Sequence, residues 1–123
     1  MKCKELQIFD WVQDKNGFQW QIIGVGDDYA YATFEDNEGD PWEFNDKDDQ
    51  PEGIPITPEI LEKNGWWYDM DVWQHEEVKF NIEKWDGRFQ CYDINQIKLD
   101  SVYQLQHALR LCGLNELADK FKV

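Results

Sequence analysis

The tetrapeptide Trp85-Asp86-Gly87-Arg88 is the strongest local constraint on the fold of this chain. Asp-Gly adopts the positive φ angles of a two-residue type I′ turn, and such a turn joins the strands of an antiparallel hairpin. It also sets the register, so that residue 82 faces 91, 84 faces 89 and 80 faces 93. Apolar residues then share one face, which predicts a half-buried hairpin. This apolar set is Phe80, Ile82, Phe89 and Cys91, and we expect it to be buried against Leu105 and Leu109.

The N-terminal half predicts several further strands, because it has short runs of aromatic and β-branched residues separated by turn residues. Asn16-Gly17 is a second hairpin signal between the first two runs. Short strands at this spacing are typical of a small antiparallel barrel or a curled sheet. The runs are residues 6–12, 18–25, 29–34 and 42–44.

Two helices are predicted from their end signals. Thr57-Pro58-Glu59 supplies an N-cap, a proline at the first helical position and an early acid, for a helix over residues 58–64. Ser101 followed by Gln104 fits a capping box, and apolar residues then repeat at helical spacing up to residue 112.

These elements predict an α+β fold. Residues 1–53 form a β-barrel-like subdomain that includes an acidic loop, and residues 54–123 contain a short central helix, a β-hairpin and a C-terminal helix packed on the sheet. Residues 45–53 have no apolar periodicity and indicate a loop or linker between the halves. One continuous domain is the alternative.

The chain is strongly acidic, with 26 Asp and Glu against 12 Lys and Arg and a formal net charge of −14. Between Asp27 and Glu52 there are eleven acidic residues and one basic residue, Lys47, so this segment alone carries −10. Phosphates and anionic lipids are bound through Lys and Arg. We therefore expect a basic protein surface as partner, with no direct nucleic acid and no membrane. A cytoplasmic protein is expected, since no apolar run reaches the roughly 18 to 20 residues of a membrane span and no signal peptide is evident.

Catalytic and metal-binding patterns find little support. Gly24-Val25-Gly26 lacks the third glycine of a dinucleotide fingerprint and indicates a turn. Ser101, the only serine, is better explained as a helix cap than as a nucleophile. Two distant histidines and three scattered cysteines offer no metal-ligand set. We expect no enzyme, no catalytic residue, no metal and no cofactor, with Cys91 and Cys112 as small core residues.

The acidic loop leaves three interpretations open. A calcium loop of the EF-hand type starting at Asp46 fails, because Pro51 stands where glycine is needed. A nucleic-acid mimic would hold its carboxylates at phosphate-like spacing against a basic groove. A solvated connector is the third interpretation.

Aromatic residues are numerous, with seven Trp, five Tyr and seven Phe. Those on predicted strands, namely Trp11, Trp20, Phe34, Phe80 and Phe89, are assigned to the core. Others lie in or near predicted loops, where a ring beside a carboxylate suits recognition of Arg or Lys, although packing over a thin core is the alternative for each. The surface from Asp36 to Glu52 is expected to bind the partner, and the candidate partner-binding residues are Trp42, Asp46, Asp48, Asp49, Trp66, Trp67 and Trp73.

Two segments resemble signatures of small uncharacterised proteins carried by phages, prophages and mobile elements of gut bacteria. They are residues 53–66, GIPITPEILEKNGW, and residues 102–113, VYQLQHALRLCG. The resemblance implies an accessory gene of a mobile element and a β-rich N-terminal segment, and it supplies no catalytic residue. Small acidic proteins of such elements often bind a host or defence protein.

The leading hypothesis is a non-enzymatic acidic module that binds another protein. One form of it would be an inhibitor, encoded by a phage or mobile element, that acts on a host or defence protein. Its partner would then be a basic, nucleic-acid-binding protein. The alternative is a protein that sequesters a nucleotide or a small cationic ligand in an aromatic pocket. A hydrolase-like enzyme with unrecognised chemistry is the weaker third.

Overall fold

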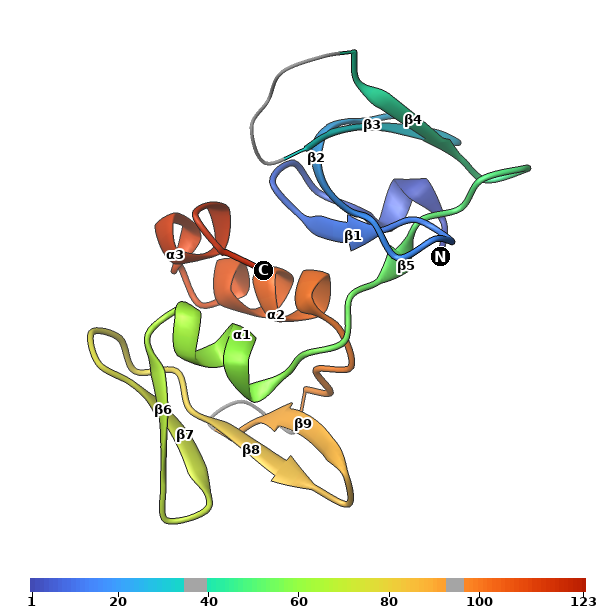
Figure 1. Cartoon of the computed structure of the whole chain (residues 1–123). Coiled ribbons are helices and arrows are strands. Elements are labelled where there is room, and N and C mark those ends of the chain that lie inside the picture. The colour runs from blue at the N-terminus through green and yellow to red at the C-terminus, as the bar shows by residue number, and fades with distance from the viewer. Residues whose placement is uncertain (35–39, 93–96) are drawn as a thin grey trace. The chain divides into compact units, whose positions relative to one another are not determined.

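Within residues 1–34, 40–92 and 97–123, which the computed structural model describes, two antiparallel sheets and three α-helices form an α+β fold (Figure 1). The chain divides into two units, Met1–Ile54 and Pro55–Val123, each with its own sheet and core. The boundary predicted after residue 53 lies one residue from this division.

The first unit is a five-stranded sheet in the order β4-β3-β2-β1-β5, curled as a half-barrel (Figure 1). Every neighbouring pair is antiparallel. Buried and exposed residues alternate along β2 and β3, so one face of the sheet carries the core. A short 3-10 helix, Cys3–Glu5, precedes the strands, which are β1 Trp11–Gln13, β2 Gln19–Val25, β3 Tyr29–Thr33, β4 Trp42–Asn45 and β5 Glu52–Gly53.

The strand predicted over residues 6–12 is too long, because β1 begins only at Trp11. The buried side chain of Asp10 accepts a hydrogen bond from the amide of Gln7 at 2.7 Å, and the amide of Asp10 donates to the carbonyl of Gln7 at 3.1 Å. These local bonds form a turn in competition with a sheet ladder. Phe9 within it has a φ of 74°.

Gly24 and Gly26 lie beside aromatic rings, but only Gly26 has to be glycine for the ring to fit. Gly24 lies inside β2, beside a bulge, where a Cβ would stand 3.9 Å from the ring of Tyr31. A Cβ on Gly26 would overlap the ring of Tyr29. The two tyrosines meet edge to face at 5.4 Å. The predicted turn is thus wrong for Gly24, which lies in a strand, and packing against the Tyr29 ring explains the glycine at residue 26.

The second unit is a four-stranded sheet in the order β6-β7-β8-β9, with its helices on one side (Figure 1). The capping residues recognised in the sequence correctly predict where two of the helices begin. The hydroxyl of Thr57 accepts from the amide of Ile60 at 3.2 Å, and Ser101 and Gln104 form the capping box. The elements are α1 Pro58–Lys63, β6 Trp66–Asp69, β7 Val72–His75, β8 Ile82–Trp85, β9 Arg88–Cys91, α2 Val102–Leu111 and α3 Asn115–Asp119.

The predicted hairpin is confirmed in its register and its turn. Ile82 pairs with Cys91 and Lys84 with Phe89, while Asp86 and Gly87 have φ of 52° and 78°. The predicted pairing of residues 80 and 93 falls partly outside the described residues. All six residues of the predicted apolar cluster are buried, namely Phe80, Ile82, Phe89, Cys91, Leu105 and Leu109.

Trp66 lies at the centre of the second core and is only 2% exposed. Its indole N–H donates to the carbonyl of Phe80 at 2.8 Å. Its ring lies 4.6 Å from that of His75, 6.3 Å from that of Phe80 and 6.4 Å from that of Phe121. One large side chain therefore joins β6, β7 and the C-terminal segment.

The cysteines differ in part from expectation. Cys91 is buried as predicted, and so is Cys3, but Cys112 is exposed. The prediction for Cys112 is wrong because α2 ends at Leu111, so residue 112 caps the helix and does not continue its buried stripe.

Candidate functional site

Three stacked rings form the most distinctive surface feature of the first unit. We call Phe34, Trp20 and Trp42 the aromatic row. Trp20 lies 4.0 Å from Phe34 and 5.6 Å from Trp42 between ring centroids, each time with 26° between the planes. Trp20 is 8% exposed, whereas Phe34 and Trp42 are 48% and 43% exposed. The row therefore has a buried centre and two rings open to solvent.

Strand register brings the row together. Trp42 pairs with Ala32 across β3 and β4, and Ala32 pairs with Ile22 of β2. Ile22 lies two residues from Trp20 on β2, so the register places Trp42 and Trp20 on neighbouring positions of the sheet. Trp42 accordingly begins β4, as the predicted strand run over residues 42–44 indicates, whereas the assignment of Phe34 to the core is wrong because nearly half of it is exposed.

Each indole of the row is held by a carboxylate. The Trp20 Nε1–H donates to Asp14 Oδ2 and the Trp42 Nε1–H to Asp49 Oδ2, both at 3.0 Å. Asp14 is buried and accepts further bonds from the amides of Asn16 and Phe18 at 2.9 and 3.0 Å. Burial acts to raise the pKa of Asp14, but these hydrogen bonds outweigh it and hold the pKa below its ordinary value. Two fixed anions thus orient the two indoles.

The segment from Asp46 to Asp49 forms a turn with hydrogen bonds inside the first unit. Asp46 Oδ1 accepts from the amide of Cys3 at 2.7 Å, which is the main reason its pKa is lowered. Burial, assisted by Asp46, raises the pKa of the Cys3 thiol to about 12. The side chain of Asn45 accepts from the amides of Lys47 and Asp48. Asp46 therefore has a structural task, whereas Asp48 is exposed.

The remaining predicted residues divide between core and surface. Trp66 and Trp73 are buried on β6 and β7, so the expectation that they contact a partner is wrong for this structure. Trp73 packs against the ring of Tyr68 at 5.3 Å. Trp67, on the opposite face of β6 from Trp66, is 45% exposed. Residues 36–39 of the predicted surface lie outside the described residues.

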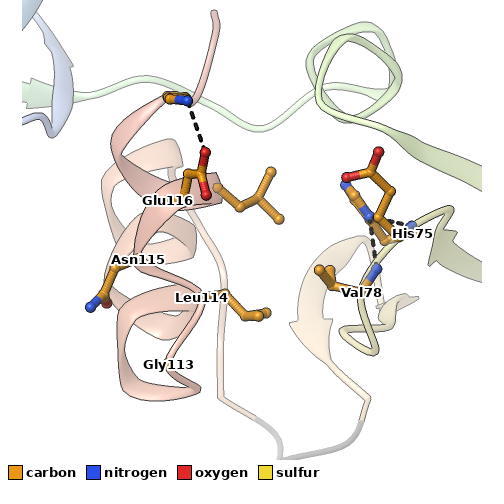
Figure 2. Close-up of a pocket in the computed structure, with 9 residues that line it drawn as sticks. His75, Val78, Gly113, Leu114, Asn115 and Glu116 are labelled. Carbon is orange, nitrogen blue, oxygen red and sulfur yellow. Dashed lines mark hydrogen bonds and ion pairs between the residues drawn. The ribbon is translucent and has the colours of Figure 1, made fainter.

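The second unit has a pocket of about 440 Å³ between the end of β7 and α3 (Figure 2). Its apolar lining comes from Val78, Leu114 and Leu117, and its charged lining from Glu77, Glu116 and Lys120. Figure 2 shows Leu114 extending towards the side where Val78 and His75 lie, while Asn115 points away. The pocket is aliphatic and charged, in contrast to the aromatic pocket of the ligand-binding alternative.

Asn64 joins His75, which lines the pocket, to Lys122 after α3. Its carbonyl accepts from His75 Nε2 at 2.7 Å, and His75 Nδ1 accepts from the amides of Glu77 and Val78 at 3.0 and 3.3 Å. Its side chain bonds both the amide and the carbonyl of Lys122, each at 2.8 Å. Neither Asn64 nor Asp14 was identified as a site residue from sequence, although Asn64-Gly65 and Asp14-x-Asn16-Gly17 are visible turn signals.

No three His, Cys, Asp or Glu side chains among residues 1–34, 40–92 and 97–123 are grouped so that they could hold a metal ion. Among the helices described here, none is long and apolar enough to cross a membrane.

Comparison of the chain with protein-family models, with curated proteins and with solved structures finds no match.

Proposed function

We propose that the first unit is a non-enzymatic interaction module that binds a basic segment of another protein at the aromatic row. The observation that carries this proposal is a pair of half-exposed rings, Phe34 and Trp42, stacked on a buried Trp20, with the indoles of Trp20 and Trp42 each bonded to a carboxylate. Large aromatic side chains that are already ordered in the free protein lose little conformational entropy on binding, and such side chains are typical of interface hot spots.

The charge of the unit supports a cationic partner. Residues 1–54 contain fourteen Asp and Glu and four Lys, which gives a net charge of −10. Exposed charge pairs are individually weak, so the acids would mainly speed the encounter and make it dependent on salt. The exposed rings would contribute affinity by packing and by cation–π contact.

The resemblance to proteins of mobile elements suggests the biological setting of this activity. We propose a cytoplasmic protein, encoded by a phage or mobile element, that inhibits a host or defence protein by covering a basic surface. A nucleic-acid-binding protein is the partner class that most often exposes such a surface.

Pull-down from bacterial lysate tests the proposal with three forms of the full chain: wild type, Trp42→Ala and Trp67→Ala. Trp67 is the matched control because its exposure, 45%, is close to the 43% of Trp42 while it lies on the second unit. We expect basic proteins to be retained by wild type and Trp67→Ala, lost with Trp42→Ala, and released by salt. Retention that is indifferent to Trp42, or that selects acidic proteins, contradicts the proposal.

The pocket of the second unit favours a second candidate function, the binding of a small amine with an apolar body. Glu116 and Lys120 pair with each other at 2.8 Å, which leaves Glu77 as the unbalanced charge of the lining. Aliphatic walls and one net negative charge suit an alkylammonium ion. The size of the pocket is within the range of small-molecule sites, roughly 300 to 1,000 Å³.

Titration of the full chain with hexylammonium, followed by backbone amide shifts in NMR spectra, tests this second function. We expect saturable shifts at Val78, Leu114 and Leu117, and an affinity about threefold weaker in Glu77→Gln. Glu76→Gln is the control, since it removes the same charge one residue outside the lining. Equal shifts with hexanoate, or no shifts with hexylammonium, would exclude the amine site.

A further inference from the structure

We propose that the aromatic row selects arginine over lysine, by stacking a guanidinium group on the exposed face of Trp42 while Asp49 accepts its N–H groups. This inference rests on the proposed function and specifies the side chain that the row recognises. It draws on the shape of the row, the position of the Asp49 carboxylate and the charge of the unit.

The shape of the row favours a planar cation. Phe34, Trp20 and Trp42 lie one beside the next with only 26° between neighbouring planes. A guanidinium group is flat and weakly hydrated, so it can extend this stack as a further layer on Trp42. The ammonium group of lysine is compact and strongly hydrated, and gains less from a flat ring.

Asp49 lies where it can complete the arginine site. Its Oδ2 accepts the Trp42 Nε1–H at 3.0 Å, so the carboxylate is at the edge of the indole. Within residues 1–34, 40–92 and 97–123, no donor bonds the other carboxylate oxygen of Asp49, Oδ1. The backbone carbonyl of Asp49 accepts from the amide of Asn45 at 3.0 Å, which fixes the acid relative to β4. A guanidinium group stacked over the indole can donate one of its N–H groups to Asp49 Oδ1.

Asp48 and Asp49 are neighbouring acids, so variants of each can distinguish a specific contact of Asp49 with arginine from the overall negative charge of the unit. Asp48 is exposed, and its amide bonds the side chain of Asn45. The indole of Trp42 donates to Asp49 and not to Asp48. Substitution of Asp48 or of Asp49 by Asn removes the same charge from the same loop. Asn at residue 49 also keeps an oxygen that can accept the Trp42 N–H, so the row keeps its support.

The experiment measures the affinity of the full chain for two short acetylated peptides that differ only in carrying Arg or Lys at every charged position. Calorimetry or fluorescence anisotropy at low ionic strength gives both dissociation constants. We expect wild type to prefer the Arg peptide about fivefold. Asp49→Asn and Trp42→Leu should each reduce this preference, and Asp48→Asn should weaken both peptides without changing their ratio.

The outcomes separate the inference from the proposed function. Equal binding of the two peptides that still requires Trp42 overturns arginine selection and leaves the basic-segment module intact. Absence of binding to either peptide contradicts the proposed function and the inference with it. An arginine preference that survives Trp42→Leu, or that falls equally in the Asp48 and Asp49 variants, overturns the assigned site.

Discussion

Replacing Trp66 with alanine is expected to unfold the second unit. Removal of a buried large aromatic side chain costs about 3 to 5 kcal/mol. The substitution also leaves the carbonyl of Phe80 without its indole donor and removes ring contacts to His75 and Phe121. At roughly 0.05 to 0.15 kcal/mol per residue, a unit of this size has a total stability of about 3.5 to 10 kcal/mol. The loss of packing and of the indole bond is therefore comparable to the lower end of that range.

Trp67→Ala provides the control, because Trp67 is the next residue of β6 but is 45% exposed against 2% for Trp66. Denaturant unfolding gives the free energy of each variant, and amide hydrogen exchange shows which unit loses protection. We expect Trp66→Ala to lose protection throughout residues 55–123 and Trp67→Ala to resemble wild type. Similar stability of the two variants would contradict the central position assigned to Trp66.

Asp14→Ala is expected to destabilise the first unit by about 3 kcal/mol, since it removes the acceptor of several hydrogen bonds to a charged group. The Trp20 indole and the amides of Asn16 and Phe18 would lose their partner. The aromatic row would lose the support of its central ring as well. Thermal or denaturant unfolding of the first unit measures this loss directly.

The acid dependence of the same residue gives an independent check. The pKa of Asp14 is lowered in the folded protein, so the unfolded chain takes up its proton first as the pH falls. The stability that the Asp14 carboxylate contributes is complete above its unfolded pKa, near 3.9, and is lost as the pH falls through the folded value. Asp14→Asn cannot titrate at this position and should lose less stability between about pH 5 and pH 2 than wild type. Parallel curves would show that this carboxylate is not held in its charged form.

Local signals explain most of what could be predicted of the fold. The turn at Asp86-Gly87, the cap at Thr57 and the capping box at Ser101 each involve residues close in sequence, so their consequences follow from few atoms. Residues 6–10 could not be predicted in this way. Their composition favours a strand, and the two hydrogen bonds between Gln7 and Asp10 form a turn in its place.

Long-range pairing explains why the candidate site was harder to predict. Trp66 and Trp67 are identical in type and adjacent, and only the pairing of β6 with β7 decides which of them enters the core. Similarly, nothing local shows that Asp46 bonds Cys3 whereas Asp49 bonds Trp42. Trp42 and Asp49 could be identified from sequence because both residue types suit cation binding. Phe34 could not, because its place in the aromatic row follows from an exposure that only the structure shows.

The contacts of Asn64 bear on the chemical ageing of the protein. Asn-Gly sequences deamidate when the glycine amide nitrogen attacks the asparagine side chain, and Asn64-Gly65 is such a sequence. Here the Gly65 amide donates to the carbonyl of Glu62 at 3.2 Å, and the Asn64 side-chain amide donates to the carbonyls of Ile60 and Lys122 at 2.8 Å. The folded state thus holds both reacting groups in other bonds. A carboxylate formed at residue 64 would face the carbonyl oxygens of Ile60 and Lys122 and would keep only the bond from the Lys122 amide, so an aged molecule would hold its C-terminal segment less firmly.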